Sequence, residues 1–425
     1  MSRRGVLDVV VVGAGVVGAA AALSLARDGL SVALVEPREP APWSAASPDL
    51  RVYAFAPDNA AFLEDLGVWR EVLARRAQPY RAMQVWDAAG GRPLRFDADQ
   101  LARRELGWIV EHGLLVDRLW AGLPAAGVQL HCPDRVIGLQ QDRGTESGSG
   151  PGAKPGSDPD VATLELASGL RLRARLIVAA DGADSPLRTL AGIATDTRHY
   201  GQRGLVAFVE TSQSHRQTCW QRFLPSGPLA FLPFAGGAVD ADAAGTGAAG
   251  SHDRCSSIVW TLPEAEASRL LDVEDAAFLV ELERAFDGPL GTMRAVSARA
   301  AFPLRRQLAR SQHSGRVVLV GDAAHVVHPL AGQGVNLGLR DVSTLRATLA
   351  SAAARGADIA AATRLARWAR ERRSENAMAA HAFDGLNRLF SNDSMAATLL
   401  RGNAMGVVGR VPPLNRMLWR QAAGL

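Results

Sequence analysis

A glycine-rich turn near the N-terminus is the first feature whose residue types and spacing could do chemistry. Residues 8–12 predict an apolar strand, residues 13–18 read GAGVVG, and the small apolar residues up to Arg27 predict a helix. In such a unit the first glycine allows a tight turn, the second lets the backbone approach a pyrophosphate, and the third lets helix and strand pack closely. Free N–H groups at the helix start would bind the phosphates. The pattern predicts a dinucleotide site that uses Gly13, Ala14, Gly15, Val16 and Gly18.

An acidic residue completes this pattern. Glu36 follows the predicted strand 31–35 and lies 23 positions after Gly13. Its carboxylate would accept hydrogen bonds from ribose hydroxyls and would repel a 2′-phosphate. The same glycine spacing recurs at 245–250, but that copy lies in a Gly/Ala-rich stretch with no strand before it, so we assign it no function. The N-terminal motif by itself leaves NAD and FAD both open.

An Asp-Gly pair follows a second predicted strand. Residues 170–180 begin as an alternation of apolar and polar residues and become a continuous apolar run, which is typical of a strand that enters the middle of a sheet. Asp181 and Gly182 come directly after it. Taken alone, such a pair is more often only a turn.

A Gly-Asp pair follows a third predicted strand, residues 316–320. Gly321 and Asp322 end this strand, and the glycine-rich run 332–338 begins ten positions after Asp322. A carboxylate at a strand end can bind a ribityl or ribose hydroxyl, while a helix N-terminus beyond it stabilises negative charge on an electron-rich ring. This arrangement suits a long ligand such as a flavin nucleotide.

The three motifs together resemble those of the group A flavoprotein monooxygenases, whose best-known members hydroxylate phenols. The resemblance implies that the first motif and Glu36 hold the ADP half of FAD, and that Asp181 and Gly182 serve both FAD and the passing nicotinamide nucleotide. It also implies that Gly321 and Asp322 hold the ribityl chain. The expected flavin-ring loop consists of Gly332, Gln333, Gly334, Val335 and Asn336.

Several stretches are similar to the ubiquinone-biosynthesis hydroxylases within this family. The similarity covers nearly the whole chain, with two departures: His112 follows Glu111 where the subfamily usually has asparagine, and Phe55 follows Ala54 where it usually has leucine. The matching stretches are 49–55, 62–69, 328–334, 370–376 and 384–392.

The resemblance implies an FAD-dependent monooxygenase that hydroxylates the aromatic ring of a polyprenylated phenol in ubiquinone biosynthesis. NADPH or NADH would reduce FAD, O₂ would add to form a flavin C4a-hydroperoxide, and the protein would supply position and dryness. The expected catalytic residues are Arg51, which would also contact the flavin ring, and Pro329, whose carbonyl would face the substrate. The alternative for Arg51 is an ordinary surface arginine. We expect no metal site, and we interpret His325 and His328 as structural.

Two other functions stay open at this stage. The first is hydroxylation of a soluble aromatic compound or of a natural-product intermediate on the same scaffold. The second is a flavin-binding but non-catalytic member of a quinone-synthesis complex. The three FAD motifs argue against the second function, because a non-catalytic protein has no need for a flavin-ring loop.

Composition limits the other classes of function. The chain has 425 residues, of which 48% are hydrophobic and 21% charged, as in a soluble globular enzyme, and this length predicts two or three domains. Three widely spaced cysteines argue against disulfides and zinc and favour a reducing, cytoplasmic setting. The net charge of +4 and the pI of about 9.4 come from dispersed arginines, so they fit a solvated surface or weak attraction to anionic lipid at the inner membrane. No basic run with interleaved aromatics indicates nucleic acid.

The predicted fold class is α/β: a Rossmann-like FAD-binding domain of the glutathione-reductase type, with an inserted β-sheet-rich substrate domain and C-terminal helices. Two Gly-rich segments, 142–160 and 235–254, predict exposed loops. The FAD-binding domain is expected at 1–75, 100–188 and 299–365, the substrate domain at 76–99 and 189–298, and the C-terminal helical segment at 366–425. Six aromatics of the substrate domain could line a pocket or fill a core: Phe208, Trp220, Phe223, Phe231, Phe234 and Trp260.

Overall fold

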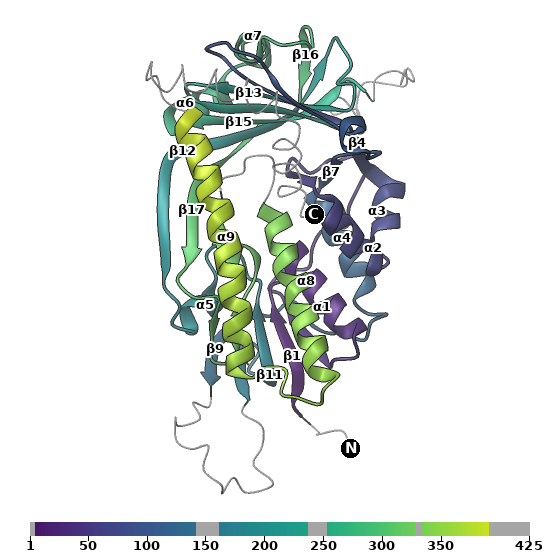
Figure 1. The fold of residues 1–425 in the computed structure, drawn as a ribbon, viewed down its shortest axis with the longest axis vertical. Coiled ribbons are helices and arrows are strands. Elements are labelled where there is room, and N and C mark those ends of the chain that lie inside the picture. The colour runs from purple at the N-terminus through teal and green to yellow at the C-terminus, as the bar shows by residue number, and fades with distance from the viewer. Residues whose placement is uncertain (1–4, 142–160, 237–252, 328–333, 391–425) are drawn as a thin grey trace, which may run out of the picture.

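The computed structural model describes residues 5–141, 161–236, 253–327 and 334–390. Over these residues the chain forms three sheets and the helices that cover them. Figure 1 shows the sheet that contains β1 and β11 at one end of the molecule and the sheet that contains β12, β13 and β15 at the other. The predicted α/β class, with one Rossmann-like unit and one sheet-rich unit, is confirmed.

The first sheet, called sheet A here, has eight strands. Its central strands β19, β11, β1, β2 and β8 are all parallel to their neighbours, which is the arrangement of a nucleotide-binding α/β sheet. In spatial order the strands are β18 (His313–Ser314), β19 (Val317–Leu319), β11 (Arg171–Ala179), β1 (Leu7–Val12), β2 (Val32–Val35) and β8 (Gln129–His131), with β10 (Ala162–Leu166) and β9 (Val136–Gln141) attached beside β11.

Both faces of sheet A are buried, which explains why its strands read as continuous apolar runs. One face packs against helices on which small residues allow close approach, and the other packs against β9, β10 and a short helix. The helices of the first face are α1 (Val16–Arg27), α4 (His112–Gly122), α8 (Gly334–Ala353) and α9 (Ala362–Phe390), and the short helix is α5 (Pro186–Leu190).

The large sheet, called sheet C here, has nine strands and is mostly antiparallel. One of its faces packs on helices α6 (Glu264–Asp272) and α7 (Asp275–Phe286), which Figure 1 shows at the end of the molecule far from β1. In spatial order the strands are β20 (His325–Val326), β17 (Ala300–Ala309), β12 (Thr195–Thr211), β15 (Cys255–Pro263), β14 (Gly227–Pro233), β13 (Thr218–Leu224), β5 (Ala82–Asp87) and β6 (Leu94–Asp97), and β16 (Met293–Val296) pairs with β12.

A small third sheet is formed by strands that lie, along the sequence, between strands of sheet A and strands of sheet C. It joins β3 (Val52–Phe55), β7 (Gly107–Glu111) and β4 (Ala77–Tyr80) in that order. The remaining elements are the helices α2 (Pro57–Asp65) and α3 (Trp69–Arg76) and two 3₁₀ turns, η1 (Asp99–Leu101) and η2 (Gly321–Ala323).

The substrate sheet extends further along the chain than the sequence suggested. The expected return to the FAD-binding domain at residue 299 precedes β17, yet β17 pairs with β12 in sheet C up to Ala309. Strand β4 begins the segment 76–99, but it pairs with β7 in the third sheet rather than with sheet C. Sequence patterns show that a strand is present but carry no information on its partner. Residues 142–160, most of 235–254 and the tail after 390 lie outside the described residues.

The close packing of α1 on β1 generates a first prediction. A Cβ atom at Gly18 would overlap the carbonyl oxygen of Gly13, so α1 would have to move away from the strand. We expect Gly18→Ala to lower the free energy of unfolding by about 1–3 kcal/mol in urea titrations, because overpacking outweighs the gain in helix propensity. Gly113→Ala in α4 is the matched control, since its Cβ would meet the Asp49 side chain at 3.5 Å or more. Equal stability of the two variants would contradict this account.

Candidate functional site

The predicted motifs meet along one edge of sheet A. Strands β19, β11, β1 and β2 are neighbours and run parallel, so their carboxyl ends share that edge. Gly321, Asp181, Gly13 and Glu36 each follow the end of one of these strands within two residues. In open α/β sheets, ligands bind in the crevice beyond the carboxyl ends of the strands. The structure thus brings together motifs that lie more than 300 positions apart in the chain.

The glycine turn after β1 has the geometry of a phosphate-binding loop. Gly13 has a φ of +92°, and its N–H donates to the carbonyl of Val35 at 2.8 Å, which ties the turn to β2. Gly15 precedes the first residue of α1, and a Cβ built on it would have no atom within 4 Å. The open space at Gly15 faces the helix N-terminus, where free N–H groups would bind a pyrophosphate.

The Glu36 carboxylate is held against this turn. Its Oε2 accepts a hydrogen bond from the N–H of Ala14 at 2.7 Å, and its Oε1 accepts one from the N–H of Arg38 at 3.2 Å. Each carboxylate oxygen has a second acceptor position that these bonds leave available. A ribose placed beside the pyrophosphate could therefore donate its hydroxyls to Glu36.

The Asp181 carboxylate shapes the turn in which it lies. It accepts hydrogen bonds from the Ser185 hydroxyl and from the N–H of Leu187 at 3.0 Å, and burial raises its pKa. Gly182 has a φ of +85° with open space where a Cβ would be. Gly182 begins a turn that the Ser185 N–H closes by donating to the Gly182 carbonyl at 3.1 Å, and the backbone of Asp181 stands directly against Gly13.

A buried arginine connects the Asp-Gly turn to the Gly-Asp turn. Arg188 donates one hydrogen bond to the carbonyl of Ala183 and another to the carbonyl of Ala323, both at 2.9 Å. The Asp322 side chain is exposed to solvent, yet the protein atoms around it raise its pKa against the opposing charges of His325 and Arg305. An accessible carboxylate in this position can accept hydrogen bonds from the hydroxyls of a ribityl chain.

The start of α8 contributes less through side chains than the sequence suggested. Val335 and Asn336 are buried, and the Asn336 amide makes three hydrogen bonds within the protein: it donates to the carbonyl of Ala54 and accepts from the N–H of Ala56 and from Asn59. Contact between Asn336 and a cofactor would have to use its main chain. Gly334 begins α8 with open space at its Cβ position. His328, Pro329, Gly332 and Gln333 lie outside the described residues.

Arg51 lies immediately before β3, with 54% of its side chain exposed. Asp49 accepts the Arg51 N–H at 2.9 Å, and its other oxygen accepts the N–H of Gly113 at 3.2 Å. Burial raises the pKa of Tyr53, the charge of Asp322 adds to this effect, and the charge of Arg51 opposes it. Tyr53 thus responds to two predicted site residues that come from separate parts of the chain.

Glu111 is a site residue whose structural role the sequence did not reveal. Its buried carboxylate accepts hydrogen bonds from the Trp43 indole at 3.3 Å, the N–H of Asp49 at 2.9 Å and the Arg76 guanidinium at 3.2 Å. Burial raises the pKa of Glu111. The sequence feature that could have indicated this role is the single acidic residue at the end of the apolar strand 107–111. Through Asp49, Glu111 positions the segment that presents Arg51.

His112 forms a pair with Tyr53. The Tyr53 hydroxyl and His112 Nδ1 lie 2.9 Å apart, and the rings meet edge to face. Burial, followed by the charge of Arg51, lowers the pKa of His112 to about 4. The imidazole is therefore neutral at physiological pH, as is the amide of the asparagine that the ubiquinone-biosynthesis hydroxylases usually have at this position.

The aromatic residues of sheet C divide between its two faces. Trp220, Phe231 and Trp260 pack against α6 and α7, so they fill the core. Phe208 and Phe234 form a separate cluster with Leu50 and Val52, the residues on either side of Arg51. The face of sheet C that carries these two phenylalanines thus packs against the segment that holds Arg51, and both rings are buried there.

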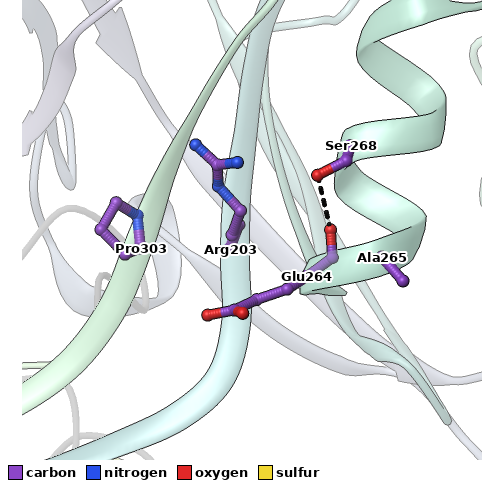
Figure 2. A pocket seen from close by; sticks show the side chains of 5 residues that line it. All are labelled: Arg203, Glu264, Ala265, Ser268 and Pro303. Atoms are coloured by element: carbon purple, nitrogen blue, oxygen red, sulfur yellow. Dashed lines mark hydrogen bonds between the residues drawn. The ribbon is translucent and has the colours of Figure 1, made fainter.

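A pocket of about 440 Å³ lies elsewhere on sheet C, where β12, β17 and α6 meet. Figure 2 shows Arg203 between Pro303 and the first turn of α6, with Glu264 below it. Both charge types line this pocket, and none of the predicted cofactor residues does. We assign it no part in the site.

Within the described ranges there is no cluster of residues that could hold a metal ion, and all three cysteines are free. Among the helices that the structure describes, none combines the length and apolar character needed to cross a membrane.

A model of the FAD binding domain family matches residues 6–383. The chain is 37% identical to ubiquinone hydroxylase UbiL of Rhodospirillum rubrum, covering 99% of this chain and 90% of that protein. It is 34% identical to 3-demethoxyubiquinol 3-hydroxylase of Escherichia coli, covering 98% of both. The chain belongs to this family of FAD-dependent aromatic hydroxylases.

Solved structures share the fold at lower identity. The p-nitrophenol 4-monooxygenase PnpA of Pseudomonas putida aligns with a TM-score of 0.73 at 19% identity, covering 99% of this chain and 98% of that one. PqsL of Pseudomonas aeruginosa, in complex with 2-aminobenzoylacetate, aligns with a TM-score of 0.71 at 21% identity, covering 94% and 99%. The family is what assigns FAD to this protein. Three features of the structure fit FAD: the open space at Gly15, the remaining acceptor positions of Glu36 and the exposed side chain of Asp322.

The open space at Gly15 leads to a prediction about FAD affinity. Gly15→Ala should cost less than about 1 kcal/mol of stability without FAD, because its Cβ meets no protein atom. It should weaken FAD binding about 10-fold or more in fluorescence titrations, because the methyl group would occupy space needed by the pyrophosphate. Unchanged FAD affinity would mean that the pyrophosphate does not lie against Gly15.

The lowered pKa of His112 predicts a pH dependence of stability. As the pH falls below the ordinary value of 6.5, the unfolded chain takes up a proton at His112 before the folded chain does, until the pH reaches about 4. The free energy of unfolding should therefore fall across this window by about 2–3 kcal/mol more in the wild type than in His112→Asn. Urea titrations at pH 7, 5.5 and 4.5 measure this, and parallel curves for the two proteins would refute it.

Proposed function

We propose that this protein hydroxylates the aromatic ring of a polyprenylated phenol in ubiquinone biosynthesis. The observation that supports this most strongly is similarity over nearly the full length to two enzymes named as ubiquinone-pathway hydroxylases, at 34% and 37% identity. Enzymes that share only a fold commonly differ in substrate. An alignment that runs through both sheets, however, includes the substrate-facing strands as well as the cofactor site.

The roles of individual residues follow from their positions. When bound, FAD supplies the redox chemistry that carries one oxygen atom from O₂ to the ring, with NADPH or NADH as reductant. Gly13, Gly15 and Glu36 hold its ADP half, and Asp322 holds the ribityl chain. Arg51, whose side chain is more than half exposed, would compensate negative charge near the ring.

The residues of the inner face of sheet C then cover the reacting ring and exclude water. Phe208 and Phe234 are buried against Leu50 and Val52, so this face of sheet C supports the segment that carries Arg51 beside the proposed ring site. Removal of water strengthens the electrostatic interactions of the site and protects reactive species from side reactions. The carbonyl of Pro329 is proposed to complete the substrate site.

The proposal extends to location and partners. A prenylated substrate resides in a bilayer, so we propose a cytoplasmic protein that touches the inner membrane peripherally and works within a quinone-synthesis complex. The dispersed arginines that give a net charge of +4 would favour an anionic lipid surface by weak attraction.

The test is anaerobic reduction of the FAD-loaded protein by NADPH, with and without a short-chain prenylphenol. We expect the prenylphenol to accelerate flavin bleaching at least 10-fold and, after air is admitted, to yield a product heavier by one oxygen atom. A matched phenol without the prenyl chain is the control and should accelerate bleaching less.

Two other outcomes would favour the alternative functions. Bleaching that responds to soluble aromatics but not to the prenylphenol would favour the alternative of a soluble substrate. Flavin that NADPH and NADH both fail to reduce under any of these conditions would favour a non-catalytic flavin-binding role.

A further inference from the structure

A buried carboxylate outside the predicted motifs joins three parts of the chain. Asp341, on α8, is completely buried. Its Oδ2 accepts the N–H of Gly321 at 3.0 Å and lies 2.6 Å from Nε2 of His325. Its Oδ1 accepts hydrogen bonds from Arg372 Nε at 2.9 Å and from Asn376 Nδ2 at 3.0 Å, both on α9. We call Asp341, His325, Arg372 and Asn376 the Asp341 cluster.

The Asp341 carboxylate is fully satisfied, but stability alone does not account for the cluster. Four donors use the four acceptor positions of the carboxylate, and the positive neighbours hold the pKa of Asp341 at about 2. Removing such charges from water costs several kcal/mol, and well-packed apolar residues often serve stability equally well. What apolar residues cannot supply is directional bonding. The cluster fixes one relative position for η2, α8 and α9.

That position matters because two of these elements carry cofactor motifs. Gly321, which donates to Asp341, immediately precedes Asp322. Helix α8, which carries Asp341, begins at Gly334 in the flavin-ring loop, and Gly338 packs against the Cα atom of Gly321. A change at Asp341 would therefore move the Asp322 carboxyl relative to the N-terminus of α8.

The third element, α9, contains none of the cofactor motifs. Arg372 and Asn376 lie one helical turn apart, and Arg372 also donates to Asn376 Oδ1 at 3.1 Å, so the two act as one unit. One turn earlier, the Trp368 indole donates to the Thr344 hydroxyl of α8 at 3.1 Å. Figure 1 shows α9 running beside α8. Asp341 is thus the link between α9 and the Gly-Asp turn.

We propose that Arg372 and Asn376 are positioning residues for FAD, so that docking of α9 on α8 and binding of FAD favour one another through Asp341. Binding energies linked in this way are reciprocal: if docked α9 strengthens FAD binding, bound FAD stabilises docked α9 by the same amount. The proposal rests on the FAD site and is independent of which aromatic compound is the substrate.

The first test compares FAD affinity among full-length variants, measured by the fluorescence of FAD released on dilution of the holoenzyme. Arg372→Met keeps the apolar stem but removes the charged bonds, and Asn376→Ala is the milder change. We expect about 10-fold weaker FAD binding in Arg372→Met and a smaller loss in Asn376→Ala. Arg367→Met is the control on the same helix, where an exposed ion pair with Glu371 contributes little, and should stay within about twofold of the wild type.

The second test separates coupling from a purely structural role. Amide hydrogen exchange in residues 362–378 is measured with and without saturating FAD. FAD should slow exchange in the wild type and in Arg367→Met, and should have at most half of that effect in Arg372→Met. A cluster that only stabilises the fold would raise exchange in Arg372→Met but leave the effect of FAD unchanged.

Either of two results overturns the proposal: FAD affinity of Arg372→Met within twofold of the wild type, or equal protection of α9 by FAD in both proteins. If Arg372→Met does not fold, Asn376→Ala decides by the same criteria. None of these measurements uses an aromatic substrate, so failure of the prenylphenol experiment would leave them unaffected.

Discussion

The site depends on the close approach of three chain segments around Val17. A Cβ at Gly338 would lie 2.7 Å from the Val17 side chain, one at Gly321 would lie 3.2 Å from it, and one at Gly18 would overlap the carbonyl of Gly13. A side chain at Gly18 or Gly338 would therefore push α1 away from its neighbours. The glycines thereby set the spacing between the phosphate-binding turn, the Asp322 carboxyl and the start of α8.

Buried polar groups then hold the segments that glycine brings together. Glu111 anchors the stretch that presents Arg51, Asn336 joins α8 to the junction of β3 and α2, and Asp341 joins η2 to α8 and α9. Each group is buried at a junction and has several hydrogen-bond partners. Such groups are costly when unsatisfied, so each favours one arrangement of the backbone around it. A site preorganised in this way needs little rearrangement when cofactor and substrate bind.

The two large sheets differ in strand arrangement and in what their faces contact. Sheet A is parallel, buried on both faces and presents strand ends to a nucleotide. Sheet C is largely antiparallel, with one face on α6 and α7 and the other bearing Phe208 and Phe234 toward the Arg51 segment. A flavin hydroxylase needs both, because one surface must hold a long polar cofactor while the other keeps water from the ring.

The sequence by itself determined the features whose chemistry is local. A strand, a glycine turn and an acid within about 25 residues form a unit wherever they occur, so Gly13, Gly15, Gly18 and Glu36 could be assigned from their spacing. Only the tertiary structure decided the pairing of β17 with β12 and the partners of Asn336. Asn336 bonds to residues 277 to 282 positions away, and Asp341 joins Gly321 to Asn376. A pattern of apolar and polar residues shows that a side chain is buried, but it does not say which distant group meets it there.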